Sequence, residues 1–180
     1  GTCTLTAITD ANIQTAVDLW VSDPAVATNT YGDISTWNVS QVTDMSALFR
    51  DKITFNDDIS NWDVSSVIDM KYMFADAIAF NQDIGAWDVS NVTNMNNMFY
   101  DADSFNQDIS TWCVINIVSE PSEFSADSPL SESNKPVWGT CTLTAITDAN
   151  IQTAVDLWVS DLAAATTTYG NISTWDVSQV

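Results

Sequence analysis

Residues 55–74 read FNDDISNWDVSSVIDMKYMF, and residues 80–99 read FNQDIGAWDVSNVTNMNNMF. The two stretches begin 25 residues apart, and residues 105–112, FNQDISTW, begin a third copy. A unit this short cannot bury its own apolar face, whereas stacked copies share one continuous core. The repeat therefore predicts a solenoid in which successive units stack on one another.

Apolar residues of the same type recur at the same position of each unit. Two of these columns are predicted to form the core: Trp37, Trp62, Trp87 and Trp112, and Phe49, Phe74, Phe99 and Phe124. The alternation Trp-x-Val is typical of a short strand with both side chains on one face. Apolar residues between Met45 and Phe49 have the spacing of one helical turn. We therefore predict short parallel strands and short helical turns with a 25-residue period.

A longer repeat contains the short one. Residues 1–42 and 139–180 agree at 37 of 42 aligned positions, with an offset of 138 residues. We expect one complete module over 1–138 and the start of a second, truncated module over 139–180. The sequence is then a window on a longer tandem array.

The complete module is predicted to have three parts: a cap over 1–32, four 25-residue repeats over 33–118, and an irregular Ser/Pro-rich connector over 119–138. In the cap, Asp10 is a good helix N-cap, and Ile13, Val17 and Trp20 follow at helical spacing. We expect an amphipathic helix over about 11–21 that covers the open end of the solenoid in each module.

The three runs quoted first resemble the BspA-type leucine-rich-repeat surface proteins, a group often described only as a domain of unknown function. The resemblance covers about residues 33–112 and again 171–180. It implies a leucine-rich-repeat-like solenoid on a secreted or surface-attached protein, associated with adhesion and without catalytic residues to carry over. The fourth unit, WCVINIVSEPSEF, departs from the pattern because it lacks the Asp after Trp and the Met.

The charge excludes several classes of function. Twenty-four acidic residues face four basic ones, and histidine is absent, which gives a formal net charge of −20. Nucleic acid binding needs a basic surface, which four basic residues cannot provide. The sequence also contains no run of about 18 apolar residues, so it predicts no membrane-spanning helix. Without histidine, neither a Ser-His-Asp set nor a histidine metal site can form. We therefore expect no enzyme and no cofactor.

The chain has three cysteines, an odd number. Cys113 lies in the last predicted repeat and Cys141 opens the next module, so we predict a disulfide between them where the two modules meet. Cys3, the copy of Cys141, would pair with an upstream module or a neighbouring subunit. Such a disulfide implies an oxidising, extracellular compartment. The alternative is three buried free thiols.

Polar residues form columns of their own. One acidic column consists of Asp33, Asp58, Asp83 and Asp108. These carboxylates either accept hydrogen bonds at turns and face water, or bind structural Ca²⁺ between adjacent turns. The calcium signal is weak because no Asp-x-Asp-x-Asp-Gly loop occurs. Asn56, Asn81 and Asn106 form an amide column that is predicted to hydrogen-bond along the coil.

Three N-x-S/T sequons, at Asn38, Asn91 and Asn171, predict N-glycosylation of a secreted protein. The first functional hypothesis is a non-enzymatic extracellular structural protein whose identical modules associate head to tail into a fibre, stalk or filament. The alternative is a cell-surface adhesin that binds a host, matrix or glycan ligand through the solenoid face. Tyr72 and Tyr100, which lie outside the core columns, are the aromatic residues best suited to that role.

Overall fold

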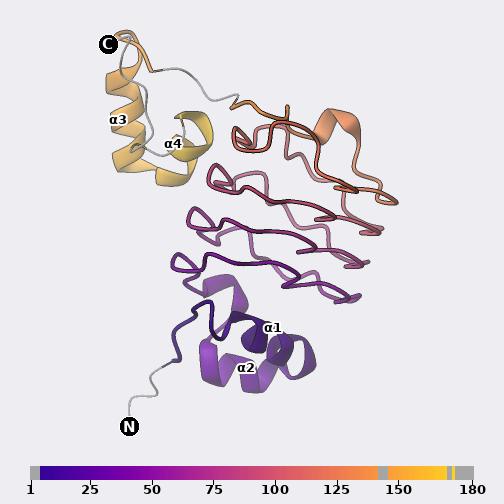
Figure 1. The fold of residues 1–180 in the computed structure, drawn as a ribbon. Helices are drawn as coiled ribbons and strands as arrows, with labels where there is room; N and C mark the ends of the chain where they lie inside the picture. The colour runs from indigo at the N-terminus through magenta and orange to yellow at the C-terminus, as the bar shows by residue number, and fades with distance from the viewer. Residues whose placement is uncertain (1–4, 142–145, 170–171, 173–180) are drawn as a thin grey trace.

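The computed structural model describes residues 5–141, 146–169 and 172. Its elements, in chain order, are α1 (Ile13–Ser22), α2 (Pro24–Tyr31), the 3₁₀ turns η1 (Ile34–Thr36) and η2 (Glu132–Asn134), α3 (Ile151–Ser160) and α4 (Leu162–Tyr169). Figure 1 shows α1 and α2 below a stack of flattened coils, with α3 and α4 near its other end. We call these the first (33–57), second (58–82), third (83–107) and fourth (108–137) coils.

Among the residues that the structure describes, the predicted short parallel strands do not form, and the prediction of a strand-based leucine-rich-repeat solenoid is therefore wrong. In the described part of the chain, extended residues pair only as isolated bridges, Asp44 with Asp69 and Asp69 with Asn94. The Trp37 N–H donates to Ile34 O, three residues back, and the same kind of turn recurs throughout each coil. The chain turns on both sides of each Trp-x-Val pair. The alternation of buried and exposed residues therefore arises from a series of tight turns and not from a strand.

The short helical or 3₁₀ turn predicted between Met45 and Phe49 is present only as a tight turn, in which the Leu48 N–H donates to Met45 O at 3.3 Å. Ala47 and Tyr72, one repeat apart, have φ of 55° and 58°, in the left-handed region, which interrupts a right-handed helix. A second left-handed position recurs at Asp51, Asp76, Asp101 and Asp127. Aspartate enters this region more readily than most residues, so this acidic column has a backbone role.

Backbone and indole hydrogen bonds join each coil to the next. The Phe49 N–H donates to Met73 O at 2.9 Å, and the Phe74 N–H donates to Met98 O at 2.9 Å. The Trp62 Nε1–H donates to Ile34 O of the preceding coil at 2.8 Å. Since donor and acceptor lie about one repeat apart in sequence, the 25-residue period sets the register of the stack.

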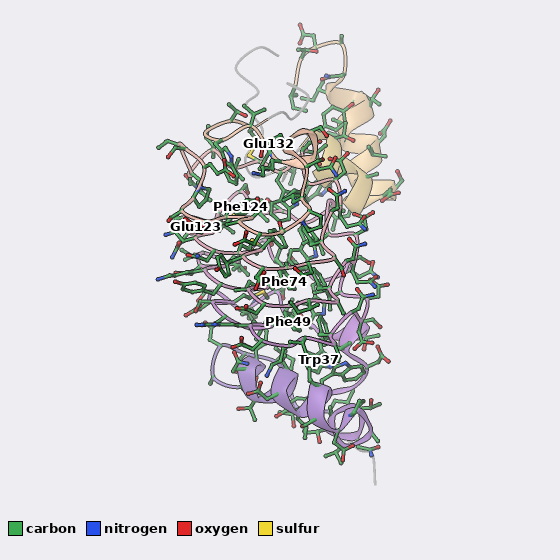
Figure 2. All side chains as sticks on the ribbon, turned by 90° about the vertical axis from the view of Figure 1, so that its right-hand side faces the viewer. Trp37, Phe49, Phe74, Glu123, Phe124 and Glu132 are labelled. Carbon is green, nitrogen blue, oxygen red and sulfur yellow. A yellow bond between two sulfur atoms is a disulfide. The ribbon has the colours of Figure 1, made fainter. Side chains whose placement is uncertain are left out.

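The aromatic columns form the core. All eight predicted members are buried, none more than 4% exposed. The Phe49 and Phe74 ring centroids are 5.3 Å apart, with 2° between the planes, and Figure 2 shows both rings inside the stack. Phe124 is buried too, but its ring stands at 89° to that of Phe99. Burial of this apolar surface is the main favourable term in folding.

Residues 119–138, expected to be an irregular connector, lie on the stack and complete the fourth coil. Leu130 is 6% exposed and lies 25 residues after Phe105, whose column it continues. The Ser131 N–H donates to Asn106 Oδ1 at 3.0 Å. The column of Phe105 thus continues into this segment, although its Ser and Pro content is typical of a loop and the left-handed residues Asp101 and Asp127 lie 26 residues apart.

Candidate functional site: the caps and the junction between modules

The apolar face of α1 covers the open end of the first coil. Ile13, Ala16, Val17 and Trp20 are its buried residues. The Trp20 Nε1–H donates to Asp57 Oδ2 at 2.8 Å. The cap thus combines apolar burial with a directed hydrogen bond, which fixes where α1 lies on the stack.

Asp10 joins the cap to the stack, and its predicted role as the N-cap of α1 is wrong. The N-cap residue is Asn12. Asp10 Oδ1 accepts the Thr43 N–H at 2.7 Å, and Oδ2 accepts the Thr43 hydroxyl at 2.8 Å. These bonds lower the pKa of Asp10, with the backbone N–H of Thr43 contributing most. The carboxylate of Asp10 therefore binds Thr43, 33 residues away in sequence, and does not bind the N-terminus of α1.

The second cap repeats the first in sequence and in secondary structure. α3 has the same ten residues as α1, IQTAVDLWVS. In α3, however, Ala154 is the buried residue, while Ile151, Val155 and Trp158 are half-buried. The helix therefore forms in both caps, but the face that α1 packs on the first coil is only partly covered in α3.

A disulfide links the fourth coil to the second module. Cys113 and Cys141 are bonded with S–S 2.04 Å and Cα–Cα 4.1 Å, so the predicted pair forms. Nearby, Gly139 has φ 73°, and a Cβ there would lie 3.3 Å from Val118 Cα, so a larger residue would be strained. A covalent bond and a close backbone approach thus fix the start of the second module. Cys3 lies outside the described residues, and its pairing stays a prediction.

The four aspartates considered for calcium are turn acceptors. Asp33, Asp58, Asp83 and Asp108 each accept the backbone N–H two residues on, at 2.9–3.0 Å. The side-chain and backbone bonds from Ser60 and Ser110 lower the pKa of Asp58 and Asp108. Over the part of the chain that the structure describes, no three His, Cys, Asp or Glu residues come together to hold a metal ion. The geometry therefore favours the turn interpretation.

The second acidic column is electrostatically strained at its centre. Burial raises the pKa of Asp76, and the negative charges of Asp51 and Asp101, one coil away on either side, raise it further. Arg50 opposes the shift. The left-handed backbone conformation explains why aspartate recurs at this position of each coil. The repulsion between successive carboxylates opposes folding and results from that recurrence.

The amide column hydrogen-bonds along the stack, as predicted. Asn56 Oδ1 accepts the Asn81 N–H at 2.9 Å, and Asn81 Oδ1 accepts the Asn106 N–H at 3.1 Å. The sequence analysis missed the adjacent glutamines: the Gln82 Nε2–H donates to Asn56 O at 2.7 Å. The recurring FNQD motif was the available signal for them.

The two sequons within the described residues are exposed but differently engaged. Asn38 Oδ1 accepts the Ser40 N–H at 3.1 Å and the Ser40 hydroxyl at 2.7 Å. The Asn91 Nδ2–H, on the nitrogen that a glycan would modify, donates to Ser65 O of the preceding coil at 2.8 Å. Asn171 lies outside the described residues. Glycosylation stays a prediction at all three positions.

Two of the four basic residues gather on one half-buried tyrosine. Arg50 Cζ lies 5.1 Å and Lys71 Nζ 5.0 Å from the ring centroid of Tyr72. Cations at these distances are attracted to the ring face. Arg50 Nε also lies 3.6 Å from Asp51 Oδ2, so the positive charge of the cluster is partly balanced.

A family described as "Mycoplasma protein of unknown function, DUF285" matches residues 22–137. The chain belongs to the DUF285 family. The match includes residues 119–137, in keeping with their place in the fourth coil of this DUF285 protein. No curated protein and no solved structure matches the chain. No helix among the described residues is long and apolar enough to cross a membrane.

Proposed function

We propose that this DUF285 protein is a non-enzymatic extracellular structural protein whose modules join head to tail into a fibre, stalk or filament. The observation that carries the proposal is the junction at Cys113 and Cys141, where the end of one stack is bonded to the start of a second module. The resemblance to BspA-type surface proteins supports a place at the cell surface. The disulfide supports an oxidising compartment.

The repetition of the cap supports assembly in one direction. α1 and α3 have the same sequence, and α1 shows which face of that sequence packs on a first coil. A contact that joins the front of one module to the back of the next is heterologous, and it extends into an open filament when its rotation does not close a ring. Each module would then present the same two ends.

The charge supports a separate, unclumped fibre. A net charge of −20 on 180 residues keeps the protein soluble. Repeated along an array, this charge would repel a parallel neighbour. The recurring aspartates that produce it serve as turn acceptors and left-handed backbone residues, which are structural roles and support a non-enzymatic protein.

A second candidate, a cell-surface adhesin, is favoured by the cluster at Tyr72. Lys71 and Arg50, which also pairs with Asp51, place a small patch of two cations on this ring, outside the core. A patch of this kind suits an anionic host, matrix or glycan ligand. The adhesin would use modules as rods that display the patch, without further assembly.

Electron microscopy of the purified native protein, prepared without reductant, tests the two candidates. Head-to-tail assembly predicts long fibres of uniform width with a regular axial repeat, which becomes irregular when a reductant opens the disulfides at the junctions. Dispersed short rods of one length, unchanged by reductant, would contradict the filament. Such rods would support the adhesin if replacement of Arg50 and Lys71 by Glu abolished their adsorption to a surface that bears carboxylated glycans.

A further inference from the structure

The outer face of the fourth coil is as well buried as the coils inside the stack. Ile109, Trp112 and Val114 are 0%, 2% and 0% exposed. The 25-residue repeat ends with this coil, and an uncovered end would leave its apolar residues open to solvent. Another segment therefore covers this face, as α1 covers the end of the first coil.

Residues 134–141, which we call the strap, lie across the beginning of the fourth coil. The Ile109 N–H donates to Asn134 O at 2.9 Å. The Val114 N–H donates to Thr140 O, also at 2.9 Å. Each end of the strap is thus hydrogen-bonded to the backbone of the coil that it covers.

Apolar side chains of the strap lie between these two bonds. Pro136 is buried, and Trp138 packs against the core of the stack. The ring centroids of Trp138 and Phe124 are 4.9 Å apart, with the planes at 81°, an edge-to-face arrangement that aromatic pairs favour. The strap therefore extends the core beyond the fourth coil.

In the described part of the chain, the core of the stack includes the first cap but not the second. Ile146, Ala154 and Ala165 of the second cap are buried, but none of the three belongs to the apolar core that joins the first cap and the four coils. Val17 and Trp20 of α1 do belong to it. Residues 139–141 are thus part of the first module in space, although they begin the second module in sequence.

Polar contacts hold the near end of the strap, at residues 134 and 135. The Asn134 Nδ2–H donates to Asn106 O at 3.0 Å. Lys135 Nζ lies 2.8 Å from Glu120 Oε1 and 2.7 Å from Glu132 Oε1. This end is therefore fastened to the third and fourth coils without a covalent bond.

A disulfide holds the far end of the strap, at residues 138–141. Cys141 is bonded to Cys113, which immediately precedes Val114, the donor to Thr140 O. Both cysteines are partly exposed, which leaves the disulfide open to a small thiol. The far end is therefore the part of the strap that a change in redox state can release.

We propose that the strap is a redox-sensitive closure of the stack. A dithiol reductant opens the Cys113–Cys141 bond, and residues 138–141 leave the fourth coil while the coils beneath stay stacked. In an oxidising compartment the closure stays locked. This closure does not depend on head-to-tail assembly.

The chemical step is thiol–disulfide exchange. One thiolate of the reductant attacks one sulfur of the disulfide, forms a mixed disulfide and releases the other cysteine as a thiolate. The second thiol of the reductant then attacks the mixed disulfide, frees the remaining cysteine and leaves the reductant as its own disulfide. Two electrons pass from the dithiol to the cysteine pair, and the two protons of the dithiol end on the cysteine thiols.

The test uses amide hydrogen exchange of the full chain, followed by NMR before and after reduction with dithiothreitol. We expect reduction to accelerate exchange of the Val114 amide at least about tenfold more than exchange of the Ile109 and Phe74 amides. Val114 bonds to the released end, Ile109 bonds to the end that stays fastened, and Phe74 bonds to Met98 O inside the stack. Alkylation followed by mass spectrometry shows that both cysteines are reduced.

Matched variants test whether the closed strap and the disulfide stabilise each other. Trp138→Ala weakens the closed strap and lowers the effective concentration of one cysteine at the other. Its disulfide should therefore be reduced at a ratio of reduced to oxidised dithiothreitol at least about threefold lower than in the parent protein. Val137→Ala, at a neighbouring side chain that is 60% exposed, should leave this ratio unchanged. Slow exchange of the Phe74 amide shows that each variant is folded.

Two results would overturn the proposal. In the first, full reduction accelerates the Val114 amide no more than the Ile109 and Phe74 amides, so that the disulfide stabilises the whole fold or none of it. In the second, Trp138→Ala and Val137→Ala are reduced at the same ratio, so that the strap and the disulfide are independent. Neither result bears on whether the oxidised protein forms fibres, so this proposal and the proposed function fail separately.

Discussion

α1 and α3 have identical sequences but different surroundings. Trp20 of α1 is 8% exposed and hydrogen-bonded to Asp57, whereas its copy Trp158 in α3 is half-buried. Both segments are helices of ten residues. The ten-residue sequence thus determines that a helix forms in both caps. The stability that α1 adds depends on its burial against the first coil. Four predictions follow from this contrast, beginning with the largest effect.

Truncation of the two tryptophans should give unequal losses. Trp20→Ala removes a buried ring and its bond to Asp57, and we expect the free energy of unfolding to fall by about 3–5 kcal/mol. Trp158→Ala, the matched control, should cost about 1 kcal/mol because its ring is half-buried. Urea unfolding followed by circular dichroism measures both. Equal losses would mean that the first coil adds nothing to the burial of the helix.

Removal of the disulfide should weaken the attachment of the second cap. We expect Cys113→Ser with Cys141→Ser to lower the free energy of unfolding by about 2–4 kcal/mol. The Val114 N–H, which donates to Thr140 O, should then exchange faster with solvent. Unchanged Val114 exchange in the double variant would show that noncovalent contacts alone hold the junction.

The copies Asp10 and Asp148 should differ in their response to substitution and to pH. Asp10→Asn weakens the bonds from Thr43, and we expect a loss of about 1 kcal/mol at neutral pH. The pKa of Asp10 is lowered in the folded state, so its contribution is present above about pH 4, the unfolded pKa of aspartate, and is lost as the pH falls further.

Asp148→Asn should change stability by less than about 0.5 kcal/mol, because Asp148 is exposed on the second cap. Chemical denaturation at pH 7 and pH 3 compares the two variants with the parent. A loss for Asp10→Asn that persists undiminished at pH 3 would show that the carboxylate charge is not involved.

The smallest predicted change in the free energy of unfolding comes from a substitution within the stack, away from both caps. Asp76→Asn removes the repulsion from Asp51 and Asp101 and keeps a residue that enters the left-handed region. The pKa of Asp76 is raised in the folded state, so its ionisation destabilises the fold above about pH 4 and has no effect below the unfolded pKa. We expect a gain of about 0.2–1 kcal/mol at pH 7 that disappears in acid, with no change in the exchange of α3 amides. A gain equal at both pH values would contradict repulsion as the cause.

Much of the fold and part of the site can be read from the spacing of residues. The period alone indicates that Trp62 and Phe74 are buried and that Asn56 bonds to the next coil. It also reaches Leu130, which the sequence analysis left in a connector because Ser and Pro surrounded it. The disulfide between Cys113 and Cys141 follows from the place of each in its module.

The errors have two physical causes: a short local pattern can fit more than one backbone conformation, and it does not identify nonlocal partners. The Trp-x-Val alternation fits a strand or a pair of turns, and the turns form because the Asx residues and the left-handed residues redirect the chain. Asp10 fits a helix N-cap, but Thr43 binds it. Glu120 breaks the Met column visibly, but its partner Lys135, 15 residues away, is found only in the structure.

The sequence by itself determined the register of the stack, the identity of its core columns and the helices of both caps, because each depends on residues repeated at a constant spacing or within a few positions. Only the tertiary structure decided that Asp10 and Trp20 fasten the first cap to the stack and that Glu120 pairs with Lys135. These depend on which distant groups meet after the chain has folded, and the free energy of burying or pairing them exceeds the local preferences that the sequence displays.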